Sequence, residues 1–313
     1  MCKHEPLEYR LGAASASDRL DKILAQLLPE HSRSRLQGWI EQGHVLINGA
    51  PARIRQRVGP GDHIVVHPQP APEDSAFVPE PVDFEVVAES PAWLVVNKPA
   101  GLVTHPGAGN WQGTLLNGLL HRYPELARVP RAGIVHRLDK DTSGIMVVAR
   151  TEIAQTHMVR QLQARSVHRE YVALAHGRLS GSGTIDRPLG RHPAVPVRMT
   201  VERPIAPKPA ITHYAVQRQG SDADGAAVTE VVCRLETGRT HQIRAHLASI
   251  GHPLVADTVY GGRPLAGATR HMLHARALTF DDPEGTGSVS FQVDPPADFA
   301  VVLEHIQWQS TSR

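Results

Sequence analysis

Residues 134–144 read Ile-Val-His-Arg-Leu-Asp-Lys-Asp-Thr-Ser-Gly, a cluster of charged and polar side chains inside an apolar region. Ile134 and Val135 lead into the cluster, and the run Ile-Met-Val-Val follows it at 145–148. Charges that are buried without partners cost several kcal/mol, so an ordinary core strand does not explain this composition. We therefore expect the segment to line a cleft at the end of a strand, where binding and catalytic side chains concentrate.

Two other stretches belong with this segment: REYVALAHG at 169–177 and ETGRTHQIRAHL at 236–247. Together with HRLDKDTSG at 136–144, they resemble, in the same order, the signature segments of the RluA family of pseudouridine synthases. The resemblance runs nearly end to end. Residues 105–120 and 129–144 are most similar to the D-type members of the family, which modify large-subunit ribosomal RNA. Three separated motifs in one order are far more specific than any one of them alone.

The resemblance implies an isomerase that needs neither a metal ion nor an organic cofactor. It implies that Asp139 is the catalytic aspartate, that Arg244 pairs with it, and that Tyr171 packs on the target base. The reaction breaks the N-glycosidic bond of a uridine, turns the base over and rejoins it through carbon. Such a site must hold a carboxylate, pass a proton and exclude water.

The residues themselves fit these roles. An ionised, partly buried Asp139 needs a nearby cation. Arg244 can supply it from a helix whose apolar side is marked by Ile243, and it can share a face with His241, three residues earlier. An isolated tyrosine has a pKa near ~10, so Tyr171 would need help from its surroundings to act as a base.

Two neighbours of Asp139 are expected to contact RNA, namely His136 and Arg137. Arg137 precedes Asp139 by two residues, so both side chains point to one face if the segment is extended. The target base must leave its stack before it can turn. Arg137 can fill the vacated space, hold a phosphate, or instead form a salt bridge within the protein.

Two further features leave alternatives open. Asp141 next to Asp139 would suit the carboxylate pair of a glycosidase, but an aspartate before Thr142 and Ser143 also commonly bonds to turn amides. The loop at 105–110 suits either a phosphate cradle built from backbone amides or a plain turn. The nineteen histidines show no metal-ligand spacing, so no metal site is expected.

The N-terminal region predicts a small separate module. It has a helix capped by Ser17, a second helix capped by Ser32 and ended by Gly43, and a hairpin turn at Asn48-Gly49. This arrangement resembles the alpha-L RNA-binding domain of ribosomal protein S-four, and a structural or protein-binding domain is the alternative. The arginines expected to meet RNA phosphates are Arg33, Arg35, Arg53 and Arg55, followed by Arg57.

Five prolines and several acids at 68–81 predict an extended linker. After it, strand-like runs at 84–87, 94–96, 145–149, 171–175 and 228–235 interleave with helical patterns at 114–122, 152–164 and 240–250. No regular βαβ alternation or GxGxxG fingerprint is present. We expect an alpha-L domain at 15–67, the linker at 68–81, and an α+β catalytic domain with a largely antiparallel mixed sheet at 82–310.

Composition sets wider limits. The net charge of +2 does not by itself predict nucleic-acid binding, but residues 128–172 hold eight Lys and Arg against four Asp and Glu. Such a stripe suits a phosphate-binding face or an ordinary solvated one. No apolar run approaches the ~18 residues of a membrane span, and the start lacks a secretory signal, so a cytoplasmic protein without a membrane partner is expected. Two cysteines, Cys2 and Cys233, exclude a disulfide scaffold.

The sequence therefore predicts a pseudouridine synthase with Asp139 as its nucleophile. Its expected partner is large-subunit ribosomal RNA or a pre-ribosomal particle, its expected targets are the clustered uridines of the intersubunit stem-loop, and a monomer is the default. Three alternatives remain: a C-type synthase acting on scattered sites, a hydrolase that uses Asp139 and Asp141, and an inactive RNA-binding assembly factor.

Overall fold

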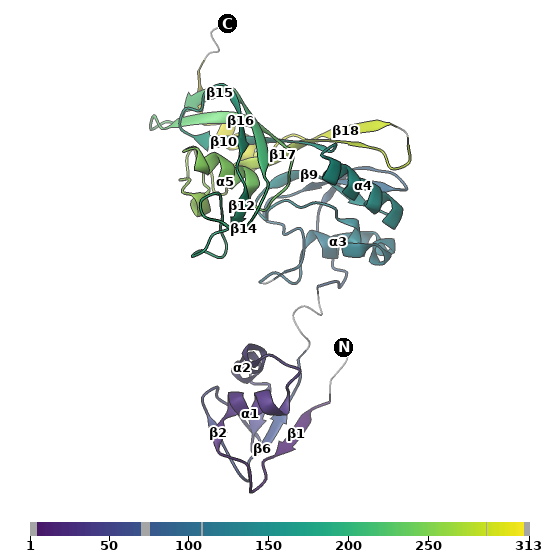
Figure 1. The fold of residues 1–313 in the computed structure, drawn as a ribbon, viewed down its shortest axis with the longest axis vertical. Helices are drawn as coiled ribbons and strands as arrows, with labels where there is room; N and C mark the ends of the chain where they lie inside the picture. The colour runs from purple at the N-terminus through teal and green to yellow at the C-terminus, as the bar shows by residue number, and fades with distance from the viewer. Residues whose placement is uncertain (1–4, 70–75, 108, 286, 310–313) are drawn as a thin grey trace. The chain divides into compact units, whose positions relative to one another are not determined.

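A computed structural model describes residues 5–69, 76–107, 109–285 and 287–309. The chain divides into two units, Met1–Asp74 and Ser75–Arg313 (Figure 1). Each unit has its own apolar core. Within the described ranges, none of the helices has the length and apolar character required to cross a membrane.

Two helices and a small antiparallel sheet form the first unit, with strands in the order β1-β6-β3-β4. Apolar side chains from both helices, including Leu24, Leu36 and Trp39, pack into one core with the sheet. The elements are β1 (Leu7–Arg10), β2 (Asp18–Arg19), α1 (Leu20–Leu27), α2 (Arg33–Glu41), β3 (Val45–Ile47), β4 (Ala50–Pro51), β5 (Arg57–Val58) and β6 (His63–Val66).

Most of the local signals predicted for this unit are confirmed. Ser32 caps α2, because its hydroxyl accepts a hydrogen bond from the amide of Arg35 at 3.3 Å. The Asn48-Gly49 turn joins β3 to β4, with positive φ at both residues as that turn requires. The cap at Ser17 is wrong. Helix α1 begins only at Leu20, whose amide donates to the carbonyl of Gln56, since β2 pairs with β5 just before the helix.

A large mixed sheet forms the centre of the second unit, in the order β11-β15-β16-β10-β17-β9-β8-β7. Two further strands extend it, because β18 pairs with β17 and β19 with β15. All these pairs are antiparallel except β9 with β17. The strands are β7 (Glu85–Glu89), β8 (Trp93–Lys98), β9 (Ser143–Ala149), β10 (His168–His176), β11 (Ser182–Asp186), β15 (Ile211–Ser221), β16 (Ala227–Leu235), β17 (Leu273–Asp281), β18 (Ser288–Gln292) and β19 (Gln307–Trp308).

Helices and a small three-stranded sheet surround this large sheet, with α5 toward one end and α3 and α4 toward the other (Figure 1). The remaining elements are α3 (Leu115–Arg122), η2 (Pro124–Arg128), η3 (Pro130–Gly133), α4 (Glu152–Ala164), β12 (Leu189–Arg191), β13 (Met199–Thr200), β14 (Ile205–Lys208), α5 (Gln242–Ser249), η4 (Thr258–Tyr260) and α6 (Ala297–Glu304). The predicted strand-like runs and helical patterns all fall on elements of the matching type. The predicted α+β class with a largely antiparallel mixed sheet is confirmed.

Two glycines bracket the segment 134–144 and bring its backbone against neighbouring strands. Gly133 has φ +76°, and a Cβ there would lie 1.7 Å from the carbonyl oxygen of Ala149 in β9. Gly144 has φ +118°, and a Cβ there would lie 2.2 Å from the carbonyl oxygen of Ala275 in β17. Only glycine fits both positions. The polar segment is thus fixed where β9 and β17 meet.

The division between the two units, at Asp74 and Ser75, lies within the predicted linker 68–81. Strand β1 begins at Leu7, before the predicted start at 15, because it pairs with β6 as a sheet edge. In the predicted linker 68–81, the described residues after the gap belong to the second unit and pack against its loop and helix α3. The Asn117 side chain donates to the carbonyl oxygens of Ala76 and Val78, and the Glu80 carboxylate accepts from the Gly113 amide. Residues 70–75 lie outside the described part of the chain.

Candidate active site

The main chain around Asp139 is held in place by side chains and amides of a neighbouring loop. The Thr104 hydroxyl donates to the carbonyl of Leu138 at 2.8 Å. The carbonyl of Lys140 accepts from the buried ammonium of Lys98 at 3.0 Å and from a loop amide at 2.9 Å. The Asp139 side chain keeps 15% of its surface exposed. A fixed backbone therefore presents a carboxylate that solvent or a substrate can still reach.

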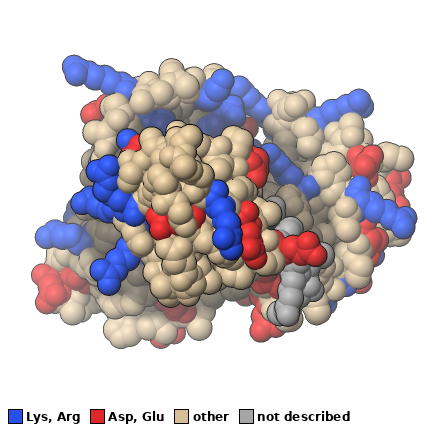
Figure 2. Space-filling model, turned by 90° about the horizontal axis from the view of Figure 1, so that it is seen from below, with Lys and Arg blue, Asp and Glu red and all other residues tan. Residues whose placement is uncertain are grey.

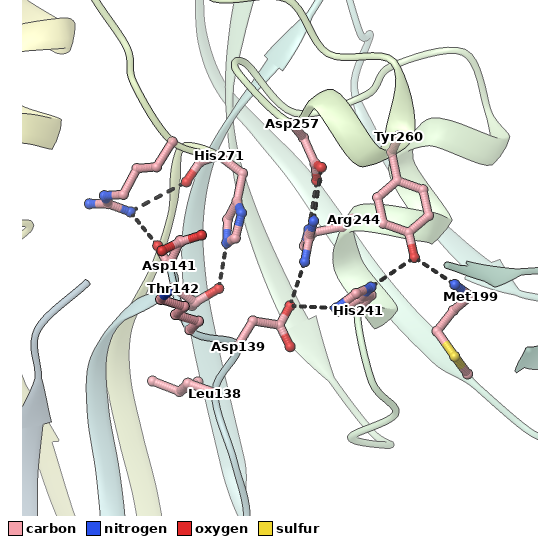
Figure 3. Close-up of polar contacts among 12 residues, drawn as sticks. Leu138, Asp139, Asp141, Thr142, Met199, His241, Arg244, Asp257, Tyr260 and His271 are labelled. Atoms are coloured by element: carbon pink, nitrogen blue, oxygen red, sulfur yellow. Dashed lines mark hydrogen bonds and ion pairs between the residues drawn. The ribbon is translucent and has the colours of Figure 1, made fainter. Parts of the chain in front are cut away.

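Arg244 of α5 joins Asp139 to a second carboxylate (Figure 3). Its Nη1 donates to Asp139 Oδ2 at 3.0 Å. Its Nε and Nη2 donate to the two oxygens of Asp257, at 2.7 Å and 2.9 Å. Asp257 is fully buried, and the bidentate pair fixes the plane of the guanidinium. The structure thus brings together Asp139 and Arg244, which are 105 residues apart in the chain.

This arrangement favours an ionised Asp139. Burial acts to raise its pKa, but the electrostatic effects of His241 and Arg244 and the Arg244 hydrogen bond outweigh burial and lower the pKa below its ordinary value of 3.8. Burial opposes the charge of Arg244, yet its bonds to Asp257 and Asp139 raise its pKa. The pair is therefore charged throughout the physiological pH range.

His241 and Tyr260 complete the polar network beside Asp139 (Figure 3). His241 Nε2 lies 3.9 Å from Asp139 Oδ2, and Nδ1 lies 3.0 Å from the hydroxyl of Tyr260. The guanidinium of Arg244 lies over the Tyr260 ring, 5.2 Å from its centroid. The expectation that Arg244 and His241 share one side of α5 agrees with these contacts, although His241 is the N-cap residue and not part of the helix.

Tyr171 lies on β10, opposite Cys233 of β16 and Ala275 of β17, and only 6% of its surface is exposed. Its hydroxyl makes no hydrogen bond with any residue in the described ranges. Burial raises its pKa, Arg169 opposes this shift and Asp139 adds to it. The phenol therefore keeps its proton at neutral pH, which makes it a poor general base and leaves its O–H available to a substrate.

We expect Tyr171→Phe to slow product formation by at least about 100-fold, the usual range for loss of a proton-transfer group. RNA binding should persist, because the ring remains and only the hydroxyl is lost. Single-turnover rates at saturating enzyme would measure this. Tyr123→Phe is the matched control, since that hydroxyl bonds only to the exposed Glu89. Near-normal turnover of the Tyr171 variant would leave the residue a packing role alone.

The two predicted RNA contacts beside Asp139 differ in their surroundings. Arg137 is exposed. His136 is half-buried, and its Nε2 accepts a hydrogen bond from the amide of Val147 at 3.2 Å. Burial and Arg169 lower the pKa of His136 to about 3, so the ring is neutral. His136 therefore supports the main chain of β9, and its contact with RNA stays a prediction, as does that of Arg137.

The structure bears on the alternative roles of Asp141 and of the loop at 105–110 that the sequence leaves open. Asp141 is half-buried, and Figure 3 shows its carboxylate on the far side of Thr142 from that of Asp139. In the loop at 105–110, the amides of Gly107 and Asn110 bond to each other's carbonyls, which suits a tight turn. No group of three or more His, Cys, Asp or Glu that could hold a metal ion occurs among the described residues.

Two of the four arginines expected to meet RNA phosphates bond to other residues of the N-terminal unit. Arg33 donates to the buried carboxylate of Asp21 at 2.6 Å, and Arg35 donates to the carbonyl of Gln69 at 2.9 Å. Arg53 and Arg55 are exposed. In the view of Figure 2, Lys and Arg side chains lie among Asp and Glu side chains. RNA contact remains a prediction for all four arginines.

Asp257 and Tyr260 are site residues that the sequence reasoning missed. A signal for Asp257 was present, because the apolar run Leu254-Val255-Ala256 leads into it, just as an apolar run leads into Asp139. Tyr260 had no comparable signal. It reaches the site because the turn around η4 folds back on α5, where Asp257 bonds to Arg244.

Comparisons with known proteins show which families the chain matches. Residues 92–249 match the family described as RNA pseudouridylate synthase, and residues 18–64 match the S4 domain. The chain is 47% identical to "Ribosomal large subunit pseudouridine synthase D" of Neisseria meningitidis serogroup B, covering 94% of this chain and 80% of the relative. Proteins of the same name are 47% identical in Pseudomonas aeruginosa, over 91% of both chains, and 43% identical in Escherichia coli O6:H1, over 97% and 95%.

Solved structures share the fold of this chain over part of its length. "Human RNA Pseudouridylate Synthase Domain Containing 1" matches with a TM-score of 0.56 and 30% identity, over 69% of this chain and 85% of that one. "Human RNA Pseudouridylate Synthase Domain Containing 4" matches with a TM-score of 0.55 over 72% and 94%. Its identity of 22% supports similarity of fold only.

Proposed function

We propose that the substrate of this chain is large-subunit ribosomal RNA. The chain belongs to the RNA pseudouridylate synthase family and isomerises uridine to pseudouridine. The relatives that match over most of both chains are named as large-subunit enzymes. The S4 domain at 18–64 supplies a second RNA-binding surface. The observation that carries the proposed catalysis is the Asp139 carboxylate, which accepts a hydrogen bond from Arg244 and keeps 15% of its side-chain surface exposed.

Asp139 is the proposed nucleophile. In the overall reaction the bond from N1 to C1′ breaks, a bond from C5 to C1′ forms, C5 loses a proton and N1 gains one. Nothing is oxidised or reduced, and no water is consumed. Arg244 keeps the carboxylate charged and orients it, and Tyr171 is proposed to pack on the base. Only 15% of the Asp139 side chain is exposed, so a bound base would cover it from the water that would trap an intermediate.

The finer proposal is that the targets are clustered uridines of the intersubunit stem-loop. One site can modify neighbouring uridines if specificity rests on the shape of the stem-loop, as RNA recognition often does. A C-type synthase also carries an S4-like module but acts on scattered sites, so the module does not discriminate between the two.

Chemical mapping of pseudouridine in ribosomal RNA tests this target. RNA from a strain that lacks the gene should lose modification at the stem-loop, and the intact gene should restore it. The Asp139→Asn gene is the matched control and should not restore it. Loss confined to scattered sites, with the stem-loop still modified, would favour the C-type alternative.

The exposed arginines of the first unit are proposed to bind RNA phosphates. Removing one such arginine should flatten the dependence of log affinity on log salt by about 0.7–0.9. The double change Arg53→Gln and Arg55→Gln should therefore reduce the slope by about 1.5. Filter binding across salt concentrations would measure it. Lys22→Gln, an exposed cation of the same unit, is the control, and an unchanged slope in the double variant would exclude both arginines from phosphate binding.

A further inference from the structure

A chain of polar contacts ends at Asp139 and begins in the small sheet of β12 to β14 (Figure 3). The amide of Met199 in β13 lies 3.0 Å from the hydroxyl oxygen of Tyr260. That oxygen lies 3.0 Å from His241 Nδ1, and His241 Nε2 lies 3.9 Å from Asp139 Oδ2. None of these three partners has a role in the reaction proposed for Asp139, Arg244 and Tyr171.

The donors and acceptors along this series of contacts can be assigned by starting from the Met199 amide. A backbone amide can only donate, so the Tyr260 oxygen accepts from Met199. Of the two groups that contact this hydroxyl among the described residues, only His241 Nδ1 can accept its proton, so we assign the Tyr260 O–H to Nδ1. A neutral imidazole that accepts at Nδ1 carries its proton on Nε2. In this tautomer the Nε2–H of His241 faces the carboxylate of Asp139.

We propose that His241 is a positioning residue for the isomerisation, held by Tyr260 in the tautomer that directs Nε2–H toward Asp139. This inference rests on the proposed role of Asp139 as nucleophile. A distance of 3.9 Å is too long for a hydrogen bond, but catalytic hydrogen bonds are often long in free enzymes and shorten when substrate binds. The N–H group would then restrain the carboxylate without neutralising it.

The surroundings hold the His241 ring in this place. His241 has φ 55°, a left-handed conformation that non-glycine residues seldom adopt outside functional or turn positions. Its ring meets the Tyr260 ring edge-on, with centroids 5.8 Å apart. Tyr260 also lies beneath the guanidinium of Arg244, so one side chain supports both nitrogen-bearing neighbours of Asp139.

The charged neighbours of His241 favour a neutral ring. Burial lowers the pKa of His241 and is the largest effect; Asp139 acts to raise it, Arg244 to lower it, Asp257 to raise it and Arg137 to lower it. Burial raises the pKa of Tyr260 to about 12, so its hydroxyl keeps the proton that it donates. A protonated His241 would instead form an ion pair with Asp139 and weaken it as a nucleophile.

Nitrogen-15 NMR of labelled histidine in the full-length protein tests the tautomer directly. The His241 signals, assigned by their loss in His241→Gln, should show a protonated Nε2 and an unprotonated Nδ1. In Tyr260→Phe this preference should disappear, because the donor to Nδ1 is gone. A wild-type His241 protonated at Nδ1, or an unchanged tautomer in Tyr260→Phe, would overturn the proposal.

Single-turnover kinetics tests the effect on the reaction. His241→Leu should slow isomerisation by up to about 100-fold, the loss typical of a misplaced reacting group. His241→Gln should recover most of the rate, because its amide N–H occupies the place of Nε2–H and does not titrate. In Tyr260→Phe, loss of the donor to Nδ1 favours protonation of His241, so the acidic limb of the pH profile should move to higher pH.

The same measurements separate this inference from the function on which it rests. Tyr123→Phe should leave both rate and pH profile unchanged. If wild-type protein does not isomerise ribosomal RNA, the proposed function fails, and the NMR result still decides the tautomer. If wild-type protein is active and His241→Leu is equally fast, only the role of His241 is overturned.

Discussion

Asp139→Asn should abolish isomerisation, with a loss on the order of 10⁴-fold or more, the scale seen when a covalent nucleophile is removed. The amide has nearly the same shape as the carboxylate but is not a nucleophile. It can still accept a hydrogen bond from Arg244, so the fold and the affinity for RNA should change little. Single-turnover assays and RNA binding on the same preparation would establish both points.

Asp141→Asn is the matched control for this change. Asp141 lies two residues away, is half-buried, and its carboxylate is directed away from that of Asp139 in Figure 3. This variant should keep most of its activity. Retention of even a few per cent of the wild-type rate by Asp139→Asn would remove Asp139 as nucleophile. Equal losses in both variants would favour the paired-carboxylate alternative.

Arg244→Lys should also give a large loss, about 100-fold in single-turnover rate. Lysine keeps the charge but cannot bond to both oxygens of Asp257 while reaching Asp139. The carboxylate of Asp139 then loses its orientation and part of the attraction that offsets its burial. Arg165→Lys, a change at an exposed ion pair with Glu236, is the control and should be neutral.

The pH dependence of Arg244→Lys has a definite sign. In the wild type the pKa of Asp139 is lowered, so activity that needs the carboxylate is lost only as pH falls to strongly acidic values. In the variant, burial is less well compensated, so the pKa rises. The acidic limb of the rate profile should therefore move to higher pH. A slower enzyme with an unmoved acidic limb would mean that Arg244 orients Asp139 without affecting its ionisation.

The structure also shows which parts of the fold are determined by local sequence. Asn48-Gly49 and Ser32 act on residues within a few positions, and both predictions are confirmed. The predicted helix cap at Ser17 is wrong because the start of α1 is set by the pairing of β2 with β5, which are about forty residues apart in the chain. The parallel pairing of β9 with β17 depends on contacts over a still longer separation, and no local pattern encodes it.

The residues of the site also differ in how far the sequence indicated them. Family motifs indicated Asp139, Tyr171 and Arg244, and the structure places the first and third in contact. The sequence did not indicate Asp257 and Tyr260, because these residues reach the site only when the turn around η4 packs on α5. For His136, the structure adds a contact that the motif did not indicate, a hydrogen bond from the backbone of β9 to its ring, and its contact with RNA stays a prediction.

The most direct test of the central claim follows both products from one substrate. Purified protein would act on large-subunit RNA carrying tritium at C5 of uridine, with released tritium, free uracil and pseudouridine measured together. An isomerase that uses Asp139 should release one tritium for each pseudouridine formed, with no free uracil, and Asp139→Asn should release none. Free uracil would reveal a hydrolase, and RNA binding without either product would reveal an inactive assembly factor; either result would contradict the account.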